Sequence, residues 1–346
     1  MTIYITGGSN SVRSGGWVDH FELEATNISI GASTSIMGAY RSLFTVDLKA
    51  GDTVIWEYAL NDGNQALGTG RAYTVDFLLR YCEAIIRACA KRGVRFVPLI
   101  FTPQHRERVP KIDEHRRKLA RLLRHYRIPF VDISRELRKI LEVETLPDAF
   151  FFDDFHYQSD SRPVKRAARR AERLCTAEFV PVDPTVPPMF VEDDLELALF
   201  ADFEGATVGE FSNRLLTIPV FEAENLPLTL GPRERGGRII GIFMICPSDG
   251  GVMEVAIKDA TGARIETFDL SVAHSEPDFP KPVFKMFSLV NARPDPVCFE
   301  AGQTIELDVA TGAGLPLTDL GFADMPDVMP DSCRVSVAGI LVELTG

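Results

Sequence analysis

The chain has 346 residues, of which 45% are hydrophobic and 25% are charged. The length allows two or three domains, and the composition is typical of a globular protein rather than a disordered one. No apolar run approaches the roughly 18 residues of a membrane span, and the N-terminal residues lack the basic and apolar stretches of a secretion signal. We therefore expect a cytoplasmic protein that is not embedded in a membrane. The six cysteines lack metal-like spacing, which predicts reduced core residues.

Charge is distributed unevenly along the chain. Residues 1–180 contain 27 Lys and Arg against 22 Asp and Glu, whereas residues 181–346 contain 10 against 27. This shift predicts a domain boundary near residue 180 and two domains that attract each other. The basic residues alternate with acids and accompany no nucleic-acid-binding motif, so we expect no nucleic-acid partner.

The first half alternates segments of strand and helix character. Runs rich in β-branched and apolar residues predict strands at residues 2–6, 54–60, 95–101 and 128–133. Apolar residues at three- and four-residue spacing predict helices at residues 71–92, 110–126 and 163–178. This alternation predicts an α/β domain over residues 1–178, in which helices cover both faces of a mostly parallel sheet.

After residue 178 the character of the sequence changes. Residues 179–190 are rich in proline and are predicted to form an extended linker. Short runs of strand character separated by turn residues follow at residues 238–246, 252–258, 264–272, 304–309 and 334–344. An all-β sandwich is therefore expected over residues 191–346, and the jelly roll is one such arrangement.

Several residues that can carry chemistry follow strand-like runs. Ser9 comes after the first strand in a Gly-Gly-Ser turn, Gly31 ends the strand-like run that begins at Asn27, and Asn61 follows the second predicted strand. Because ligands bind beyond the carboxyl ends of parallel strands, we expect these residues to face one cleft. Each signal taken alone is also typical of an ordinary turn.

Asp153 precedes His156 by three residues, in a loop ahead of the last predicted helix. A serine hydroxyl needs a base to accept its proton, and a histidine serves best when a carboxylate orients its ring. The spacing allows Asp153 and His156 to meet within one turn. Alone, the tetrapeptide is more typical of a solvated acidic loop with a chance histidine.

Taken in order, these four segments resemble the four blocks of the SGNH, or GDSL-type, hydrolase superfamily over residues 1–178. The resemblance implies a three-layer α/β/α, flavodoxin-like fold. It implies that Ser9 is the nucleophile, that His156 is the general base and that Asp153 orients His156. It also implies an oxyanion hole formed by the N–H groups of Ser9 and Gly31 and by the side chain of Asn61. No metal ion or cofactor is implied.

Two positions depart from the family pattern. Gly8 stands where the family usually has Asp, and Ala59 stands where it usually has Gly. Neither change removes a group from the implied site. We expect a serine esterase that hydrolyses an oxyester, with an acetylated saccharide or another small ester as substrate. An O-acyltransferase that uses the same residues and a non-catalytic binding protein remain the alternatives.

The remaining expectations concern substrate contacts and the second half. Gln104, His105 and Arg106 follow the third predicted strand and are expected to contact substrate. The β-rich domain is expected to bind a saccharide, to shield the catalytic domain or to form a homo-oligomer contact. All seven tyrosines and both tryptophans lie before residue 181, which weakens the saccharide-binding alternative.

Overall fold

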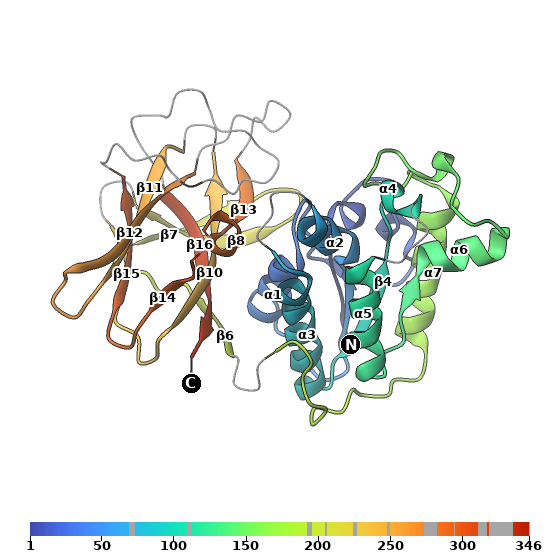
Figure 1. The fold of residues 1–346 in the computed structure, drawn as a ribbon, viewed down its shortest axis with the longest axis horizontal. Helices are drawn as coiled ribbons and strands as arrows, with labels where there is room; N and C mark the ends of the chain where they lie inside the picture. Colours follow the sequence, from blue (N-terminus) through green and yellow to red (C-terminus); the bar gives the residue numbers. More distant parts are fainter. Residues whose placement is uncertain are drawn as a thin grey trace. The chain divides into compact units, whose positions relative to one another are not determined.

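The computed structural model describes residues 1–68, 73–108, 113–191, 196–204, 206–223, 227–247, 250–272, 282–293, 295–310, 317 and 335–345. The chain divides into two compact units, Met1–Asp193 and Asp194–Gly346 (Figure 1). The proline-rich segment 179–190 therefore belongs to the first unit. No described helix is both long enough and apolar enough to cross a membrane.

The first unit is built on a parallel sheet with the strand order β2-β1-β3-β4-β5. Its strands are β1 (Ile3–Gly7), β2 (Thr26–Asn27), β3 (Thr53–Glu57), β4 (Arg95–Ile100) and β5 (Val131–Asp132). This is the doubly wound, flavodoxin-like order, in which the chain reverses direction across the sheet between β1 and β3. Ligands of such folds bind at this point, beyond the carboxyl ends of the two strands.

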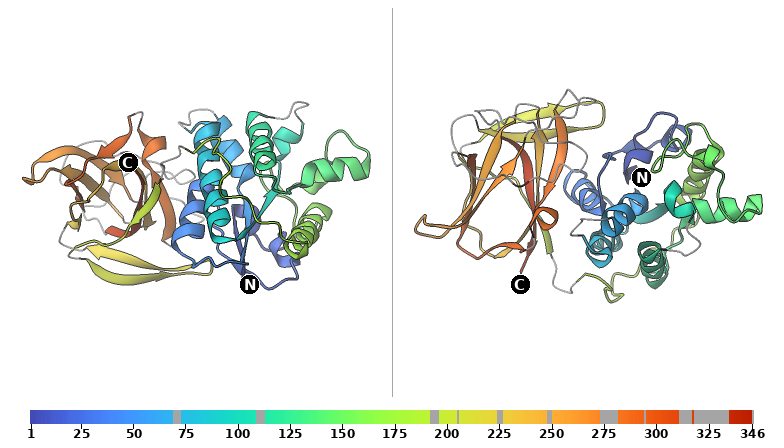
Figure 2. Two further views of the ribbon diagram at one scale, coloured as in Figure 1. Left: turned by 90° about the horizontal axis from the view of Figure 1, so that it is seen from below. Right: turned by 45° about the horizontal axis from the view of Figure 1, so that its top comes forward.

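Helices cover both faces of this sheet (Figure 2). They are α1 (Ser35–Phe44), α2 (Ala59–Leu67), α3 (Val75–Arg92), α4 (Gln104–Glu107), α5 (Glu114–His125), α6 (Ile133–Leu141) and α7 (Arg162–Thr176), with single 3₁₀ turns η1 (Ser9–Ser11), η2 (Val18–His20) and η3 (Asp148–Phe150). Buried residues of α6 and α7 pack on one face against β1, β3 and β4. On the other face, Trp56 of β3 donates a hydrogen bond to the Ser35 hydroxyl of α1. The predicted three-layer α/β/α class is confirmed.

Two predicted strands are shorter in the structure than the sequence indicated. The strand expected at 54–60 ends at Glu57, because the Tyr58 carbonyl accepts a hydrogen bond from the Asp62 N–H (2.8 Å) and opens helix α2. The strand expected at 128–133 is reduced to Val131–Asp132, because the Asp132 carboxylate caps helix α6. Short apolar runs fit a strand and a buried helix equally well, so the pattern predicted the wrong element there.

The second unit consists of two antiparallel sheets with one core between them. The larger sheet has the order β13-β10-β16-β8-β7, with β14 beside β10 and β6 beside β16; the smaller has the order β12-β11-β15-β9. The strands are β6 (Glu196–Phe200), β7 (Thr207–Ser212), β8 (Thr217–Ala223), β9 (Leu228–Leu230), β10 (Gly237–Cys246), β11 (Val252–Lys258), β12 (Arg264–Ser271), β13 (Val283–Ser288), β14 (Val297–Phe299), β15 (Thr304–Val309) and β16 (Val335–Leu344), and the short helix α8 is Leu289–Ala292. The buried core joins residues of both sheets, so the predicted β-sandwich is confirmed.

The proline-rich segment is fixed to the first unit by one buried side chain. The Glu83 carboxylate on α3 accepts hydrogen bonds from the N–H groups of Met189, Phe190 and Val191 at 2.6–2.8 Å. It also accepts the Tyr126 hydroxyl at 2.7 Å. Residues 189–191 are therefore held to helix α3 by these hydrogen bonds.

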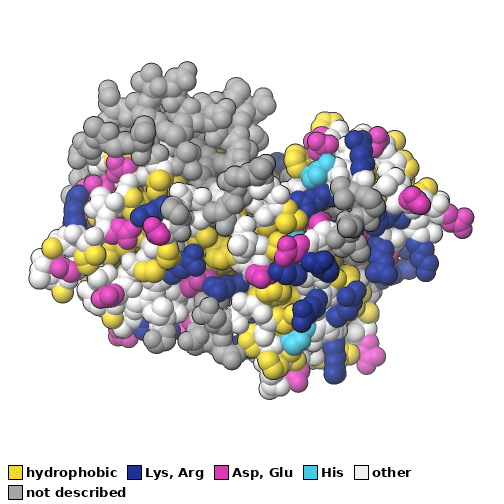
Figure 3. Space-filling view, viewed as in Figure 1, with side chains coloured by type: hydrophobic (Ala, Val, Ile, Leu, Met, Phe, Trp, Pro, Cys, Tyr) yellow, Lys and Arg dark blue, Asp and Glu magenta, His cyan; other side chains and the backbone are white. Residues whose placement is uncertain are grey.

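The surface of the first unit carries much of the basic charge that the sequence indicated (Figure 3). Helix α5 exposes Arg117, Arg121 and Arg124, as expected for a solvated helix face. Four of the five described cysteines are buried, but the side chain of Cys298 is exposed. The prediction that all cysteines lie in a core is therefore wrong for Cys298, which occupies the outward position of the alternating strand β14.

Candidate active site

Ser9 lies on a tight turn directly beyond the carboxyl end of β1. The Gly8 N–H donates to the Glu57 carbonyl at the end of β3 (3.2 Å), which holds the turn to the neighbouring strand. The Ser11 N–H donates to the Gly8 carbonyl (3.0 Å) and closes the 3₁₀ turn. The turn that carries Ser9 is thus placed at the β1/β3 reversal point of the sheet, where this fold binds ligands.

His156 lies on a short, closed loop. A β-bridge between Phe151 and Tyr157 closes the loop, and the Phe152 N–H donates to the His156 carbonyl (2.8 Å). Inside the loop, Asp153 Oδ1 accepts the N–H groups of Phe155 and His156, both at 2.8 Å. The carboxylate of Asp153 therefore shapes the loop as well as contacting the histidine ring.

The structure brings Ser9, Asp153 and His156 together. His156 Nε2 lies 2.8 Å from Ser9 Oγ, and His156 Nδ1 lies 2.7 Å and 2.9 Å from the two carboxylate oxygens of Asp153. These distances are within hydrogen-bond reach for a nucleophile, its base and the group that orients the base. The side chains of His156 and Asp153 are 26% and 41% exposed, so solvent reaches the site.

The environment of Asp153 keeps it ionised. Partial burial favours the protonated acid, but hydrogen bonds from the His156 side chain and from the N–H groups of Phe155 and His156 outweigh burial. The pKa of Asp153 is therefore held below its ordinary value of 3.8. An ionised Asp153 fixes the imidazole tautomer in which Nδ1 carries the proton and Nε2 is free to accept one.

Gly31 lies beside Ser9. The Ile30 N–H donates to the Gly7 carbonyl (3.1 Å), which continues the pairing of this segment with β1. A side-chain Cβ added at Gly31 would lie 3.8 Å from both Cα and Cβ of Ser9. The backbone of Gly31 is therefore next to the position that a group bound to Ser9 Oγ would take.

Asn61 occupies the first turn of α2, directly against Gly8. A Cβ at Gly8 would lie 2.5 Å from Asn61 Oδ1, so any larger residue at position 8 would displace the Asn61 side chain. This close approach explains glycine at the position where the resembled family has Asp. Asn61 Oδ1 is buried and has no hydrogen-bond partner among the described residues. A buried amide oxygen without a partner is uncommon in proteins.

Sequence reasoning missed Asn10, the residue next to Ser9. Its side chain is buried, with Nδ2 donating to the Phe155 carbonyl (3.1 Å) and Oδ1 accepting the Tyr157 N–H (3.2 Å). One amide therefore grips the backbone on both sides of His156. Only the position of Asn10 beside the candidate nucleophile could have indicated this role, because its partners lie 145 and 147 residues away in the chain.

Two buried carboxyl groups lie behind the site. Burial raises the pKa of Glu57 to about 8, against the opposing hydrogen bonds from the Ser11 hydroxyl and the Gly8 N–H, and the nearby Asp62 raises it further. Ser11 in turn accepts the indole N–H of Trp17 (3.1 Å). Ser11 ends the turn that carries Ser9, so the hydrogen bond from the Ser11 hydroxyl to Glu57 holds this turn in place.

Asp62 supports the other side of the site. It accepts the backbone N–H of Ser35 at 2.8 Å and the Ser35 hydroxyl at 2.5 Å, which joins α2 to the start of α1. Burial raises the pKa of Asp62 to about 7, although both hydrogen bonds from Ser35 oppose the shift. Asp62 follows Asn61 in α2, so this pair of bonds fixes the helix turn that carries the Asn61 amide.

The predicted substrate contacts form helix α4, which begins shortly after β4. The Gln104 side chain donates to Asp148 (2.9 Å), while Arg106 donates to the Gly63 carbonyl (3.0 Å) and pairs with Asp113 (3.2 Å). Arg106 Nε also donates to His105 Nε2 (3.4 Å), so all three residues have partners within the protein. The third, His105, lies edge-on to the ring of Phe155, with ring centroids 5.8 Å apart.

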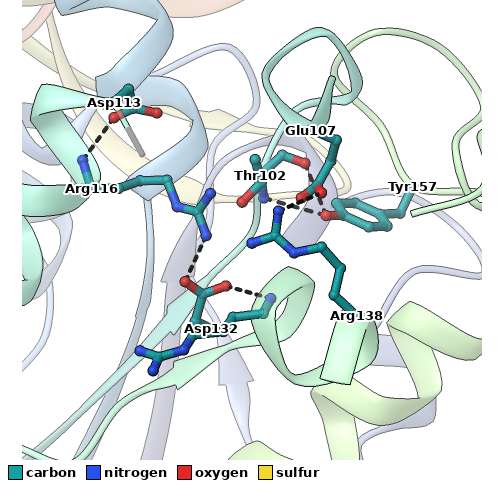
Figure 4. Close-up of polar contacts among 8 residues, drawn as sticks. Thr102, Glu107, Asp113, Arg116, Asp132, Arg138 and Tyr157 are labelled. Atoms are coloured by element: carbon teal, nitrogen blue, oxygen red, sulfur yellow. Dashed lines mark hydrogen bonds and ion pairs between the residues drawn. The ribbon is translucent and has the colours of Figure 1, made fainter. Parts of the chain in front are cut away.

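A polar network fixes α4 and the residue after His156 (Figure 4). The Tyr157 hydroxyl donates to the Thr102 carbonyl (2.9 Å) at the end of β4, and Glu107 of α4 pairs with Arg138 of α6 (3.4 Å). The His156 loop is therefore tied to the sheet through Tyr157. Among the described residues, no group of three or more His, Cys, Asp or Glu side chains is arranged to hold a metal ion.

Comparison with known proteins gives structural similarity only. No protein-family model matches the sequence, and no curated protein matches it. A Bacillus subtilis protein is similar over 49% of this chain and 54% of its own length (TM-score 0.38, 15% identity). A GDSL-like lipase from Bacteroides thetaiotaomicron is similar over 50% of this chain and 87% of its own (TM-score 0.37, 15% identity).

A third similarity concerns another part of the chain. A carbohydrate-binding module, the CBM36-1 domain of a multidomain xylanase from the hindgut metagenome of Trinervitermes trinervoides, is similar over 44% of this chain and 97% of its own (TM-score 0.22, 16% identity). The chain spans about half the length of the Bacillus subtilis protein.

We expect Asn10→Ala to loosen the His156 loop from the Ser9 turn. The variant loses two side-chain hydrogen bonds, one buried and one partly buried, each worth about 0.5–1.5 kcal/mol of stability. The rate at which a fluorophosphonate modifies Ser9 should fall at least about tenfold, because a small displacement of the base costs reactivity steeply. The midpoint of the pH dependence of that rate should also shift, which stability loss alone would not cause.

Asn213→Ala is the matched control for this variant, since Asn213 Oδ1 also accepts two backbone N–H groups (2.8 and 3.1 Å) but in the second unit. Its modification rate at Ser9 should equal that of the unaltered protein. An Asn10→Ala protein that is less stable but modified at the original rate and with the original pH midpoint would contradict the role given to Asn10.

Glu57 should make the first unit less stable as pH rises. Its carboxyl group ionises near pH 4.5 when unfolded but near pH 8 in the fold, so the folded state holds the extra proton between these values. The free energy of unfolding should therefore fall from pH 4.5 to pH 8. Glu57→Gln does not titrate, so its stability relative to the unaltered protein should increase across this window by about 2–4 kcal/mol.

Urea unfolding followed by tryptophan fluorescence measures this change, because Trp17 and Trp56 both lie in the first unit. Asp62 is present in both proteins, so the difference between their pH profiles reports the replacement of residue 57. Parallel pH profiles for Glu57→Gln and the unaltered protein would show that Glu57 is ionised in the fold.

Proposed function

We propose that the first unit is a serine ester hydrolase. The observation that carries the proposal is the continuous hydrogen-bonded chain from Ser9 Oγ through His156 to Asp153, with distances of 2.8 Å and 2.7 Å. A hydroxyl linked through an imidazole to an ionised carboxylate is the arrangement that activates serine for attack on a carbonyl carbon. The place of these residues at the β1/β3 reversal point supports the same assignment.

The reaction proceeds through an acyl-enzyme. Ser9 Oγ attacks the ester carbonyl carbon while His156 Nε2 takes the hydroxyl proton, and Asp153 stabilises the imidazolium that forms. His156 then gives this proton to the leaving alcohol oxygen as the ester bond breaks. A water molecule, deprotonated by His156, attacks the acyl carbon, and the acid leaves as Ser9 recovers its proton.

The negative charge that forms on the carbonyl oxygen is stabilised by N–H donors close to Ser9. The Asn61 amide and the backbone N–H groups of Gly31 and Ser9 are the proposed donors. Support comes from the closeness of Gly31 to Ser9 and from the contact of Asn61 with Gly8. A preorganised hole of this kind stabilises the transition state because its donors need not reorient during the reaction.

The partial exposure of His156 and Asp153 favours hydrolysis over acyl transfer, because water reaches the base. We propose an acetyl ester, most directly that of a saccharide, as the substrate. A β-sandwich joined to a hydrolase unit is compatible with a saccharide substrate, although fold alone does not select a substrate. Comparing products with and without a sugar acceptor distinguishes hydrolysis from transfer to that acceptor.

A fluorophosphonate probe tests the proposal directly. The unaltered protein should be labelled stoichiometrically at Ser9, and Ser9→Ala should abolish both labelling and hydrolysis of short-chain aryl esters. Ser14→Ala is the matched control, because Ser14 is an exposed serine in the adjacent loop. In this variant the probe should label Ser9 to the same extent as in the unaltered protein. A folded protein that is not labelled at Ser9 would identify the first unit as a non-catalytic binding module.

Asn61→Ala should lower kcat by two to three orders of magnitude with little change in KM. Removing one oxyanion donor raises the barrier by about 2.7–4 kcal/mol, and the donor acts mainly in the transition state. Asn64→Ala, in the same helix, provides the comparison and should retain full turnover. Unchanged kcat in Asn61→Ala would exclude Asn61 from the site.

A further inference from the structure

Two exposed phenylalanines flank the candidate base. Among the described Phe, Tyr and Trp side chains, only those of Phe152 and Phe155 are exposed, at 61% and 45%. Both belong to the loop that carries Asp153 and His156. Two exposed rings within four residues of the candidate base form an apolar surface at which a ligand can bind.

The backbone beneath these rings is fixed. Phe155 donates its N–H to Asp153 (2.8 Å), and its carbonyl accepts Asn10 (3.1 Å). The Phe152 N–H donates to the His156 carbonyl (2.8 Å). The N–H and carbonyl groups of Phe155 and the N–H of Phe152 are all hydrogen-bonded. The backbone that carries the two rings is therefore fixed.

Each ring also has one polar or aromatic neighbour that supports it. The guanidinium group of Arg13 lies 3.8 Å from the ring centroid of Phe152, covering one face. Phe155 meets the ring of His105 at an interplanar angle of 73°. Exposed surface remains on both phenylalanines after these contacts, so each presents apolar area to solvent.

Helix α4, which carries His105, joins the loop of the base to the helix of Asn61. The Gln104 N–H donates to the Asp154 carbonyl in the His156 loop (2.9 Å). Arg106 donates to the Gly63 carbonyl of α2 (3.0 Å), two residues beyond Asn61. Helix α4, which includes His105, thus contacts both the His156 loop and helix α2.

The proposed reaction decides which part of the substrate meets these rings. His156 must deliver its proton to the alcohol oxygen that leaves, so the alcohol lies at His156. The carbonyl oxygen lies on the other side, toward Gly31 and Asn61. Residues that flank His156 therefore contact the alcohol part of the ester rather than its acyl part.

We propose that Phe152 and Phe155 form a subsite for the alcohol part of the substrate, and that this part is a ring with an apolar face. Aryl rings and the C–H face of a sugar ring share this chemistry, because both stack on phenylalanine. The proposal rests on the proposed ester hydrolysis. It adds that selectivity among esters is set on the alcohol side by these two rings.

Kinetics on three acetates test the subsite. Phenyl acetate and an acetylated methyl glucoside carry rings, whereas ethyl acetate does not. Phe155→Ala and Phe152→Ala should each lower kcat/KM for at least one ring-bearing acetate about three- to tenfold, mainly through KM, because the ring contact binds the ground state and the transition state alike. The value for ethyl acetate should change less than about twofold. Phe155→Tyr, which keeps the ring, should restore binding.

Ile140→Ala removes an exposed apolar side chain elsewhere in the first unit and should leave all three values unchanged. A response to the glucoside supports a sugar ring, and a response to phenyl acetate alone supports an aryl ring. Equal losses on ethyl acetate, or no loss on either ring-bearing ester, would overturn the subsite. Ser9 labelling of the same variants separates this failure from failure of the hydrolase proposal, in which the unaltered protein is not labelled either.

Discussion

The hydrogen bond between Ser9 Oγ and His156 Nε2 joins residues 147 positions apart and depends on several layers of structure. The sheet places Ser9 at the end of β1, and the bridge between Phe151 and Tyr157 closes the loop of His156. Asn10 then ties this loop to the serine turn on both sides of the histidine. Loss of any one of these contacts would separate the Ser9 hydroxyl from the His156 ring, and proton transfer between them requires that they touch.

Buried carboxyl groups support this arrangement at a cost in stability. Glu57 and Asp62 are fully buried, and their raised pKa values reflect the free energy needed to place acids away from water. Each binds a serine hydroxyl that in turn accepts a tryptophan N–H, so each turn of the site has a rigid foundation. Rigid support of this kind favours reactive geometry over maximal stability.

The proposed chemistry also divides the site into two sides. Gly31 follows β2 and Asn61 follows β3, so the two proposed donors come from the strands on either side of β1, which carries Ser9. Phe152 and Phe155 lie on the side of His156, where a leaving alcohol would receive its proton. One loop therefore supplies the base and contacts to the alcohol, whereas the segment after β2 and helix α2 supply the proposed oxyanion donors.

Local sequence patterns were sufficient for much of this description. Alternating strand and helix periods predicted the α/β class, and Asp153 and His156, only three residues apart, meet within one loop whose own hydrogen bonds fix them. Periodicity failed where tertiary context chose the element, as at residues 58–62, where buried contacts make a helix of an apolar run. Exposure of Cys298 likewise depends on which face of a strand meets the core.

The sequence by itself determined which residue types were present and how short segments fold, because those properties depend on neighbours within a few positions. Only the tertiary structure decided that Asn10 grips the His156 loop, that Gly8 makes room for Asn61 and that Glu57 lies under the serine turn. These contacts span about 45–150 residues of chain. No local period encodes them, because they arise only when parallel strands bring their carboxyl ends to one edge of the sheet.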